Sequence, residues 1–446
     1  MNCGRLRWLA VLVAAVVLAV PTLAQAANEV TKWNEIAVST VNAQPPITSA
    51  PPAGAVFVAM VQGAVYGAVN SADRHGKPYL IERSFPQASA KAAAATAAFR
   101  VLDSLFGATN HEALQAAYDE SLGAIPAGQS KRQGIKVGTM AADAMLAEGH
   151  DGRAGQFGCD FVTPAPGAWQ PLPGPTGAAA CDPSSWVSNA KPFILSSPSQ
   201  FRTRGPYSLT SPEYAADYNE VKEIGSLTSA TRTAEQTHVA AFWQTNPAAN
   251  YNALARRFVD QFGLGVGDSA RLFAMLDLSA ADAIISTWND KYHYKFWRPI
   301  TAIRQGDTDD NADTEADATW TPLFSAGFPT SPPLPASPLP IGGVGGPLGT
   351  PPYPEHPSGA TTYASASMHA LASFFGTDEM STGCYLTSGR YPGEQRFFSR
   401  FSDVTNEIVE ARIWTGVHFR NADVQSANQG REVEQYVHEM QFDFVH

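Results

Sequence analysis

Alanine-rich stretches whose apolar residues recur every three to four positions are the feature that most constrains this chain. That spacing places apolar side chains along one face of an α-helix, and alanine favours helix more than any other residue. The alternating pattern of β-strands is scarce. The sequence therefore predicts an all-α helical bundle, with helices over residues 54–72, 88–107, 128–148, 213–224, 232–244, 247–262, 269–292, 360–375, 394–414 and 423–442.

Two long segments rich in proline and glycine interrupt these helices, at residues 150–212 and 306–357. Such composition indicates loops, and loops of this length are usually functional lids or flexible insertions. The sequence does not choose between the two. We predict an N-terminal helical region at 27–230 and a second helical region at 231–446, which holds the insertion loop and the chemical motifs described below.

Residues 1–26 have the pattern of a cleavable signal peptide. Two arginines precede an apolar run at 9–20, and small residues follow at 24–26. A membrane span requires about 20 apolar residues, and this run is shorter. No later uninterrupted run is long enough either. We therefore expect no membrane span after cleavage, and a secreted or periplasmic protein.

Charge and cysteines narrow the partners further. The chain carries 41 acidic and 30 basic residues, a formal net charge of −11, so we expect no nucleic-acid partner. Cys159 and Cys181 bracket a loop rich in proline and glycine, and disulfides persist in the oxidising compartments to which a signal peptide leads. We predict a Cys159–Cys181 disulfide, which would constrain the unfolded chain.

The first chemical motif lies at the end of the helix predicted over 269–292. Lys291 and Arg298 are seven residues apart, close to two helical turns, so both would share one helix face. Pro299 disfavours the helical conformation at Arg298, so one helix should end there and another begin. An ammonium and a guanidinium group suit a tetrahedral oxyanion, although such a pair is more often a solvated surface. The nearby Trp288 indicates a partly buried setting.

The second motif, at residues 353–360, precedes the helix predicted over 360–375. Ser358 and Gly359 fall at the N-terminus of that helix, where free backbone N–H groups and the helix dipole favour anions. The alternative is that Ser358 serves only as an N-cap.

The third motif contains Arg412 and His418. Six residues apart, they would point about 120° away from each other on one continuous helix, so they converge only if the helix breaks between them. Gly416 is the expected break. The alternative is that His418 is a hydrogen-bonded structural histidine.

In this order the three motifs resemble the signature of the vanadium-dependent haloperoxidases and of the type-2 phosphatidic-acid phosphatase superfamily. That signature is Lys-x6-Arg-Pro, then Pro-Ser-Gly-His, then Ser-Arg-x5-His-x3-Asp. The similarity extends to the body of bacterial haloperoxidase-like proteins and covers most of the chain after the signal peptide. The matching motif residues are Lys291, Arg298, Pro299, Pro357, Ser358, Gly359, Arg412 and His418.

The resemblance implies a role for each matching residue. His418 would bond vanadium in a haloperoxidase or attack phosphorus in a phosphatase. The oxygens of vanadate, for which phosphate can compete, would be held by Lys291, Arg298, Arg412, the Ser358 hydroxyl and the Gly359 N–H. Trp288 and Tyr353 resemble the residues that line the halide side of the pocket, and the alternative is that they are core aromatics.

Three positions depart from the signature. Ala411 replaces serine, and Asp423 arrives one residue late, which leaves open the group that orients the His418 ring. Ala360 replaces the histidine that acts as the acid–base group, an effect typically worth about 10²–10⁴-fold in rate. His356, four residues earlier, is a candidate for that task.

We therefore expect a vanadate-dependent haloperoxidase that oxidises halide with hydrogen peroxide and halogenates a small organic acceptor. Two alternatives stay open. One is a secreted acid phosphatase with His418 as nucleophile. The other is a family member that binds phosphate or vanadate without catalysis, for which Ala360 is the main argument.

Overall fold

The computed structural model describes residues 28–326 and 350–443, except residues 75, 153, 155–162, 173–180 and 392. Over this part the prediction of an all-α protein is confirmed. The α-helices are α1 (Glu29–Asn42), α2 (Pro46–Ser49), α3 (Pro51–Asp73), α4 (Ala90–Gly123), α5 (Gln129–Glu148), α6 (Pro212–Ile224), α7 (Ala234–Phe242), α8 (Pro247–Phe262), α9 (Val266–Tyr294), α10 (Pro299–Arg304), α11 (Gly359–Phe375), α12 (Phe401–Trp414) and α13 (Arg420–Val437).

Short elements connect or extend these helices. They are the 3₁₀ turns η1 (Ser185–Asn189), η2 (Gly306–Thr308) and η3 (Leu323–Ala326), the π-helical turn η4 (His438–Phe442), and the strands β1 (Glu379–Thr387) and β2 (Gln395–Arg400). The predicted signal peptide lies outside the described residues. Cys181 is disulfide-bonded. Because Cys159 is also outside the described residues, its pairing with Cys181 stays a prediction.

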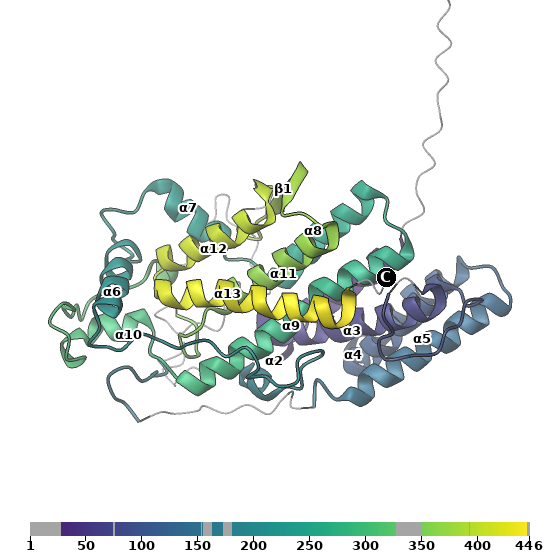
Figure 1. Ribbon diagram of the computed structural model, residues 1–446, viewed down its shortest axis with the longest axis horizontal. Coiled ribbons are helices and arrows are strands. Elements are labelled where there is room, and N and C mark those ends of the chain that lie inside the picture. The colour runs from purple at the N-terminus through teal and green to yellow at the C-terminus, as the bar shows by residue number, and fades with distance from the viewer. Residues whose placement is uncertain are drawn as a thin grey trace, which may run out of the picture.

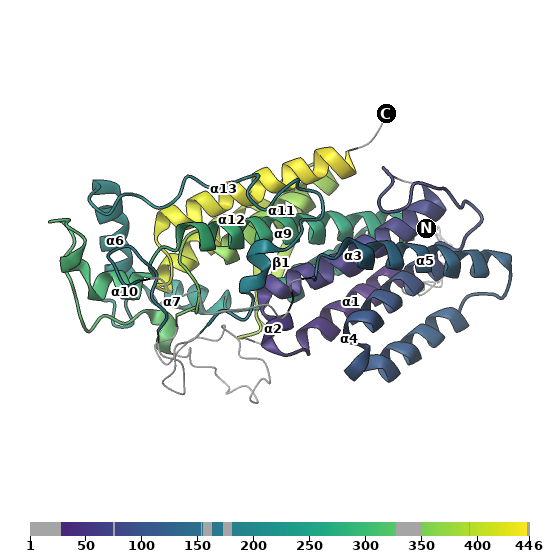
Figure 2. The ribbon, with the colours of Figure 1, turned by 90° about the horizontal axis from the view of Figure 1, so that it is seen from below.

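Helix α9 runs through the middle of an elongated molecule and packs against α3, α11 and α13 (Figure 1). Helices α3, α4 and α5 lie toward one end of the molecule, and α6 and α10 lie at the other (Figure 2). One hydrophobic cluster includes side chains from α3, α9, α11 and α12. The core therefore continues across residue 230, where we placed the boundary between two helical regions.

Helix α3 is the core helix that contacts α9 most extensively. Among the described helices, only α3 is long and apolar enough to cross a membrane, and its apolar window is entirely buried in the fold. A helix that is apolar all round belongs in a protein core or a membrane, and here the core accounts for it. A Cβ on Gly63 would lie 2.6 Å from Met145 and 3.3 Å from Leu278, so glycine allows α3 to approach both α5 and α9.

The prediction of one helix over 394–414 is wrong in its first third. Residues Gln395–Arg400 form β2, which pairs with β1 in an antiparallel hairpin, and α12 begins only at Phe401. The β2 side chains alternate between exposed and half-buried. Phe398 packs against the core, while Phe397 is 69% exposed. This two-residue period is the signal of a strand, but it lasts only six residues beside a long helical pattern.

Among the described residues, α1, the short helix α2 and the second half of α4 lie outside the predicted ranges. Helix α1 buries Val30, Trp33 and Val41 at helical spacing, but polar residues between them weaken the pattern. Helix α4 continues past residue 107 to Gly123. Its second half is exposed on most sides, so it lacks the apolar face on which the prediction depended.

Asp277 is a buried carboxyl in the middle of α9. Its Oδ1 accepts a hydrogen bond from Asn252 Nδ2 at 2.8 Å, and its Oδ2 has no partner among the described residues. Burial raises the pKa of Asp277 to about 7. Because an unfolded aspartate titrates near pH ~3.9, the folded state holds the extra proton between these two values. The resulting stability is fully present below about pH 4 and is lost as the pH rises through about 7.

We therefore expect the free energy of unfolding of Asp277→Asn to fall less steeply than that of the wild type between about pH 4 and pH 7. Urea unfolding at several pH values measures both slopes. The exposed Asp119→Asn in α4 controls for the loss of one negative charge. Equal slopes for the wild type and Asp277→Asn would contradict the assignment.

Candidate functional site

Lys291 lies fully buried in the last turn of α9. Its Nζ donates hydrogen bonds to the carbonyl oxygens of Pro354 at 3.0 Å, Glu355 at 2.9 Å and Pro357. An ammonium group has three protons, so these bonds use all of them. Burial and the neighbouring Arg298 guanidinium lower the pKa of Lys291 well below its usual value. Lys291 therefore fixes the segment before α11 and, when protonated, contributes charge rather than a free donor.

Arg298 reaches the site by a turn of the chain. Helix α9 ends at Tyr294, with Lys295 in the left-handed conformation at a φ of 48°. Helix α10 begins at Pro299, as the sequence predicted. The prediction that Lys291 and Arg298 share one helix face is wrong, because the helix ends between them. They converge on the Tyr353–Pro357 segment instead.

The guanidinium of Arg298 is buried, and only some of its N–H groups have hydrogen-bond partners among the described residues. Nε donates to the Tyr353 carbonyl at 2.9 Å and Nη1 to the Val417 carbonyl at 2.8 Å, and Nη1 also lies 3.3 Å from His418 Nε2. Nη2 is buried and has no hydrogen-bond partner among the described residues. Burial lowers the pKa of Arg298 to about 10, so the group stays charged at neutral pH.

His418 is buried in the turn that joins α12 to α13. Its Nδ1 lies 2.8 Å from Glu355 Oε1, which also accepts the backbone N–H of Phe419 at 3.1 Å. Oε1 acts as an acceptor, so we assign the ring proton to Nδ1 and the lone pair to Nε2. Burial and the charges of Arg298 and Lys291 lower the pKa of His418 well below its ordinary value. The imidazole is therefore neutral, with Nε2 available as a ligand or nucleophile.

Glu355 is the group that orients His418, and the sequence analysis did not identify it. The only sequence feature that could have indicated this role is the position of Glu355, three residues before Ser358 in the second motif. Asp423, the residue that the motif spacing suggested, accepts a hydrogen bond from Thr361 Oγ1 at 2.5 Å instead. Burial raises the pKa of Glu355 to about 8 and that of Asp423 to about 7.

Ser358 and Gly359 begin α11 beside Trp288. Ser358 occupies the N-cap position of α11, but its side chain makes no capping hydrogen bond. Its backbone N–H donates to Ser426 Oγ at 2.6 Å, and its hydroxyl lies 3.3 Å from Thr361 Oγ1. A Cβ on Gly359 would lie 2.6 Å from a Trp288 ring carbon, so glycine allows this close approach.

Arg412 lies in the last turn of α12, and the chain breaks after it at Gly416, whose φ is 75°. The helix break expected at Gly416 is confirmed. As a result, Arg412 and His418 line the same cavity. The Nε of Arg412 is buried and has no hydrogen-bond partner in the described part of the chain.

We expect Gly416→Ala to destabilise the protein by about 2–4 kcal/mol, from a left-handed non-glycine residue together with overpacking. A Cβ there would lie 2.5 Å from the Gly225 carbonyl oxygen and 2.8 Å from Pro322. Thermal unfolding measures the effect. Gly265→Ala is the matched control, because no atom lies within 4 Å of its added Cβ and its φ is −69°. Similar melting temperatures for the two variants would argue against this account.

The cavity beside His418 has a volume of about 190 Å³. Gly359 and Ala360 line it at the start of α11, and Trp288 and Tyr353 form an aromatic wall with ring centroids 5.1 Å apart. The sequence had suggested both aromatic residues as pocket residues. The Cζ of Arg298 lies 5.0 Å from the Tyr353 ring centroid, so a positive charge packs against this ring.

His356 does not line this cavity. Its Nε2 lies 3.1 Å from Thr203 Oγ1, and its ring packs edge to face against Tyr294 with centroids 5.4 Å apart. It lines a separate small cleft together with Tyr207 and Asp217. Burial lowers the pKa of His356 to about 3. This placement corrects the expectation that His356 replaces the missing histidine.

Asp182 is the only carboxylate among the described residues that line the cavity. Its Oδ2 accepts hydrogen bonds from Trp288 Nε1 and the Tyr292 hydroxyl, both at 2.9 Å, and its Oδ1 accepts the Ser184 N–H at 2.8 Å. No sequence motif identified this residue, because it lies in the first proline- and glycine-rich loop, far from the three motifs.

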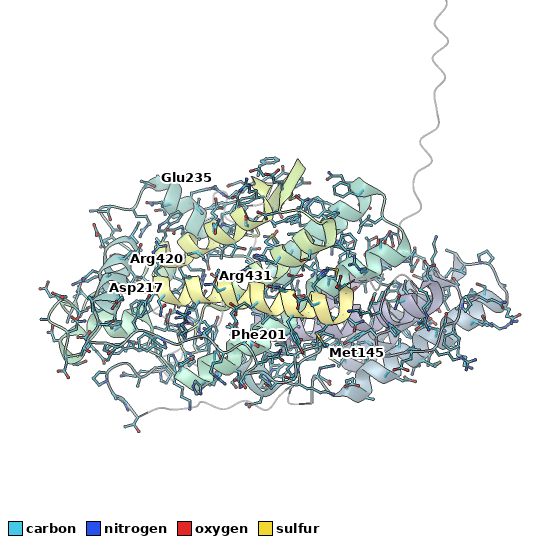
Figure 3. All side chains as sticks on the ribbon, viewed as in Figure 1. Met145, Phe201, Asp217, Glu235, Arg420 and Arg431 are labelled. Atoms are coloured by element: carbon cyan, nitrogen blue, oxygen red, sulfur yellow. The ribbon has the colours of Figure 1, made fainter. Side chains whose placement is uncertain are left out.

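Ion pairs hold the turn that carries His418. Arg420 bonds Glu220 of α6 and Glu410 of α12, with nitrogen–oxygen distances down to 2.6 Å. The next backbone N–H, of Asn421, donates to Asp217 at 2.8 Å. Arg420 and Asp217 lie close together where α6 meets the start of α13 (Figure 3). These contacts connect α6, α12 and the start of α13 next to His418.

Residues 271–446 match the family model of the VCPO second helical-bundle domain. The vanadium chloroperoxidase of Curvularia inaequalis is 24% identical over 214 residues, which cover 41% of this chain and 32% of that protein. The match thus spans about a third of that relative's length.

Solved structures resemble the chain over more of its length. The first bacterial vanadium-dependent iodoperoxidase superimposes with a TM-score of 0.71 at 20% identity, covering 93% of this chain and 98% of that chain. The holo form of a bacterial vanadium-dependent chloroperoxidase gives 0.66 at 18% identity, covering 93% and 97%. The fold is thus the helical bundle of these proteins. Residues 271–446 thus match a domain model of the vanadium chloroperoxidases, and the chain shares the fold of the bacterial vanadium haloperoxidases.

Proposed function

We propose that this protein is a vanadate-dependent haloperoxidase that oxidises halide with hydrogen peroxide. The observation that carries the proposal is a pair of buried guanidinium nitrogens, Arg298 Nη2 and Arg412 Nε, which have no hydrogen-bond partner among the described residues. Both arginines lie close enough to the neutral His418 to lower its pKa. An unpaired buried N–H costs about 1–3 kcal/mol, and more when charged. A bound oxyanion would satisfy both groups.

The residues present fit vanadate. His418 Nε2 would bond the vanadium atom, and the oxygens would be held by Arg298, Arg412, the Ser358 hydroxyl and the Gly359 N–H. Vanadate, when bound, supplies the Lewis-acidic centre at which peroxide is activated toward halide. Phosphate has the same tetrahedral shape and charge, so it would compete for the site.

The protein's own residues prepare this chemistry. Glu355 holds the proton on His418 Nδ1 and thereby keeps Nε2 free. Trp288 and Tyr353 exclude water from one side of the site. Alanine at position 360 supplies no acid–base group, and Asp182 is the one carboxylate among the described residues that line the cavity.

A second candidate function is an acid phosphatase, because a neutral histidine held by a carboxylate also suits nucleophilic attack on phosphorus. Ala360 counts against it, since the leaving alcohol needs an acid. The third candidate is a protein that binds phosphate or vanadate without turnover.

One set of assays separates these candidates. The purified protein, with and without orthovanadate, is tested for peroxide-dependent bromination of phenol red and for hydrolysis of p-nitrophenyl phosphate, and calorimetry measures vanadate and phosphate binding. Bromination that requires vanadate supports the proposal. Phosphatase turnover inhibited by vanadate would overturn it, and binding without either activity would support the non-catalytic alternative.

We further propose that the protein is exported, because its first 26 residues have the pattern of a signal peptide. N-terminal sequencing of protein recovered from the periplasm or the medium tests this proposal. An N-terminus near residue 27 supports export, whereas protein that keeps residue 1 and stays in the cytoplasm contradicts it.

A further inference from the structure

We propose that a chain of hydrogen bonds behind Ser358 makes the oxyanion site select ions that carry a hydroxyl group over fully deprotonated ions of the same shape and charge. The chain runs from Ser358 through Thr361 to Asp423. Hydrogen phosphate belongs to the first kind of ion and sulfate to the second. The inference rests on the oxyanion site of the proposed function, but it needs neither vanadate nor the oxidation of halide.

The hydrogen bonds of this chain have one direction. Asp423 ends the chain, because an ionised carboxylate has no proton and only accepts. Thr361 Oγ1 donates its single proton to Asp423 Oδ1 at 2.5 Å. Thr361 Oγ1 therefore accepts from the Ser358 hydroxyl, which lies 3.3 Å away. The proton of Ser358 thus points toward Thr361, and the lone pairs of Ser358 Oγ remain for a ligand.

The packing of α11 against α13 holds the three residues together. Ser358 is the N-cap of α11, Thr361 lies in its first turn, and Asp423 lies in the first turn of α13. All three residues are fully buried, so bulk water does not compete for their protons. Asp423 Oδ2 has no hydrogen-bond partner among the described residues. A bond from Ser358 directly to that oxygen would turn the serine proton in the same direction.

Charged groups around Asp423 decide when its carboxylate accepts. Burial raises the pKa of Asp423 to about 7. The cations that face it are Arg412, Lys291 and Arg298, and they favour the ionised form. Glu355 is an acid that faces it, and its charge opposes ionisation. At about pH 8 the ionised form predominates, and the hydrogen bonds then have the direction given above.

A bound ion therefore meets an acceptor at Ser358 Oγ. At about pH 8 phosphate is mainly HPO₄²⁻, whose P–OH group can donate to such an oxygen. Sulfate has the same tetrahedral shape and the same double negative charge but no proton, so one of its anionic oxygens would face the serine lone pairs. A site that hydrogen-bonds a ligand hydroxyl rejects the analogue without it by up to about 10⁴–10⁵-fold, because a buried polar group is left unpaired.

Calorimetric titration of the protein with phosphate and with sulfate at about pH 8, without vanadate or peroxide, tests this inference. The wild type should bind phosphate at least about 100-fold more tightly than sulfate. In Asp423→Asn the side-chain amide can donate to Thr361, so Thr361 can donate to Ser358 and Ser358 to the ion. The ratio of the two affinities should then fall at least about tenfold. The lost charge cancels in this ratio, because both ions carry the same charge.

Asp277→Asn is the matched control, since Asp277 is a buried carboxyl of α9 whose pKa is also raised to about 7 and which does not line the cavity. It should leave the ratio unchanged. Thr361→Ser keeps the hydroxyl in the middle of the chain and should retain the ratio. A smaller fall than in Asp423→Asn is expected for Thr361→Val, because Asp423 Oδ2 can accept the serine proton instead. Phosphate binding by each variant shows that the site is still assembled.

The outcomes separate this inference from the proposed function. Equal affinities of the wild type for phosphate and sulfate, or a ratio that Asp423→Asn leaves unchanged, would overturn the inference even if vanadate-dependent bromination is present. Selection of phosphate without vanadate-dependent bromination would contradict only the haloperoxidase function. Absence of binding by both ions would contradict the oxyanion site, and this inference with it. The wild-type ratio decides even where a variant does not fold.

Discussion

His418→Ala is expected to abolish vanadate-dependent bromination and to weaken vanadate binding by more than about 100-fold, which is the upper end of the effect of residues that only orient a ligand. The structure supports this because Nε2 of His418 is a neutral nitrogen ligand that lies 3.3 Å from Arg298 Nη1 and close enough to Lys291 and Arg412 for their charges to act on it. Calorimetry with orthovanadate measures the affinity independently of turnover. Phosphate should be retained better, since the guanidinium groups would still hold its oxygens.

The matched control is His238→Ala. His238 also pairs with a carboxylate, Glu394, at 2.5 Å, but it lies half-exposed on α7 and does not line the cavity. It should leave vanadate affinity within about twofold of the wild type, because it lies outside the shell that orients the ligand. Vanadate binding by His418→Ala equal to that of His238→Ala would remove His418 from the site.

Glu355→Ala is expected to lower vanadate affinity by about 10–100-fold, the range typical of a group that orients a histidine ligand. Without it, the His418 Nδ1–H and the Phe419 N–H lose their common acceptor, and the ring is free to rotate or change tautomer. Glu355→Gln keeps an acceptor oxygen and removes the carboxyl group that can ionise, so its effect should be smaller. The two variants together separate orientation of the His418 ring from ionisation of residue 355.

Glu394→Ala removes the carboxylate partner of His238 and serves as the control for Glu355→Ala. Circular dichroism and melting temperature should be checked for each variant, because placing Gln or Ala at a buried position near Lys291, Arg298 and Arg412 changes stability as well. If Glu355→Ala binds vanadate as the wild type does, Asp423 or another group orients the ring.

Local pattern predicted much of the fold, because an apolar period of 3.6 residues survives in most of the helices. Helix α8 begins and ends where the sequence placed it, at Pro247 and Phe262. The apolar period did not predict β2, where six residues are too few to show an alternation. It also missed α1, where polar residues interrupt the apolar face of the helix. Boundaries set by glycine and proline, such as Gly416 and Pro299, were the easiest to place.

The site was harder to predict, because motif spacing gives the order of residues but not the direction of their side chains. Lys291 is seven residues from Arg298, yet the chain turns at Lys295 between them. Glu355 and Asp423 were both near the motifs, and only the folded segment shows that Glu355 faces His418. Asp182 comes from a loop without any motif, so only the structure brings it to the cavity.

The three oxyanion motifs come from α9 and the turn after it, the start of α11, and the end of α12. No one of these segments makes the site alone. Unfolded chains therefore have no comparable affinity, and any bound oxyanion adds to stability by mass action, about 2.7 kcal/mol when its concentration is 100 times its dissociation constant. A rise in melting temperature with phosphate would then show that these three segments have come together. Phosphate binding is in this sense a test of the complete fold.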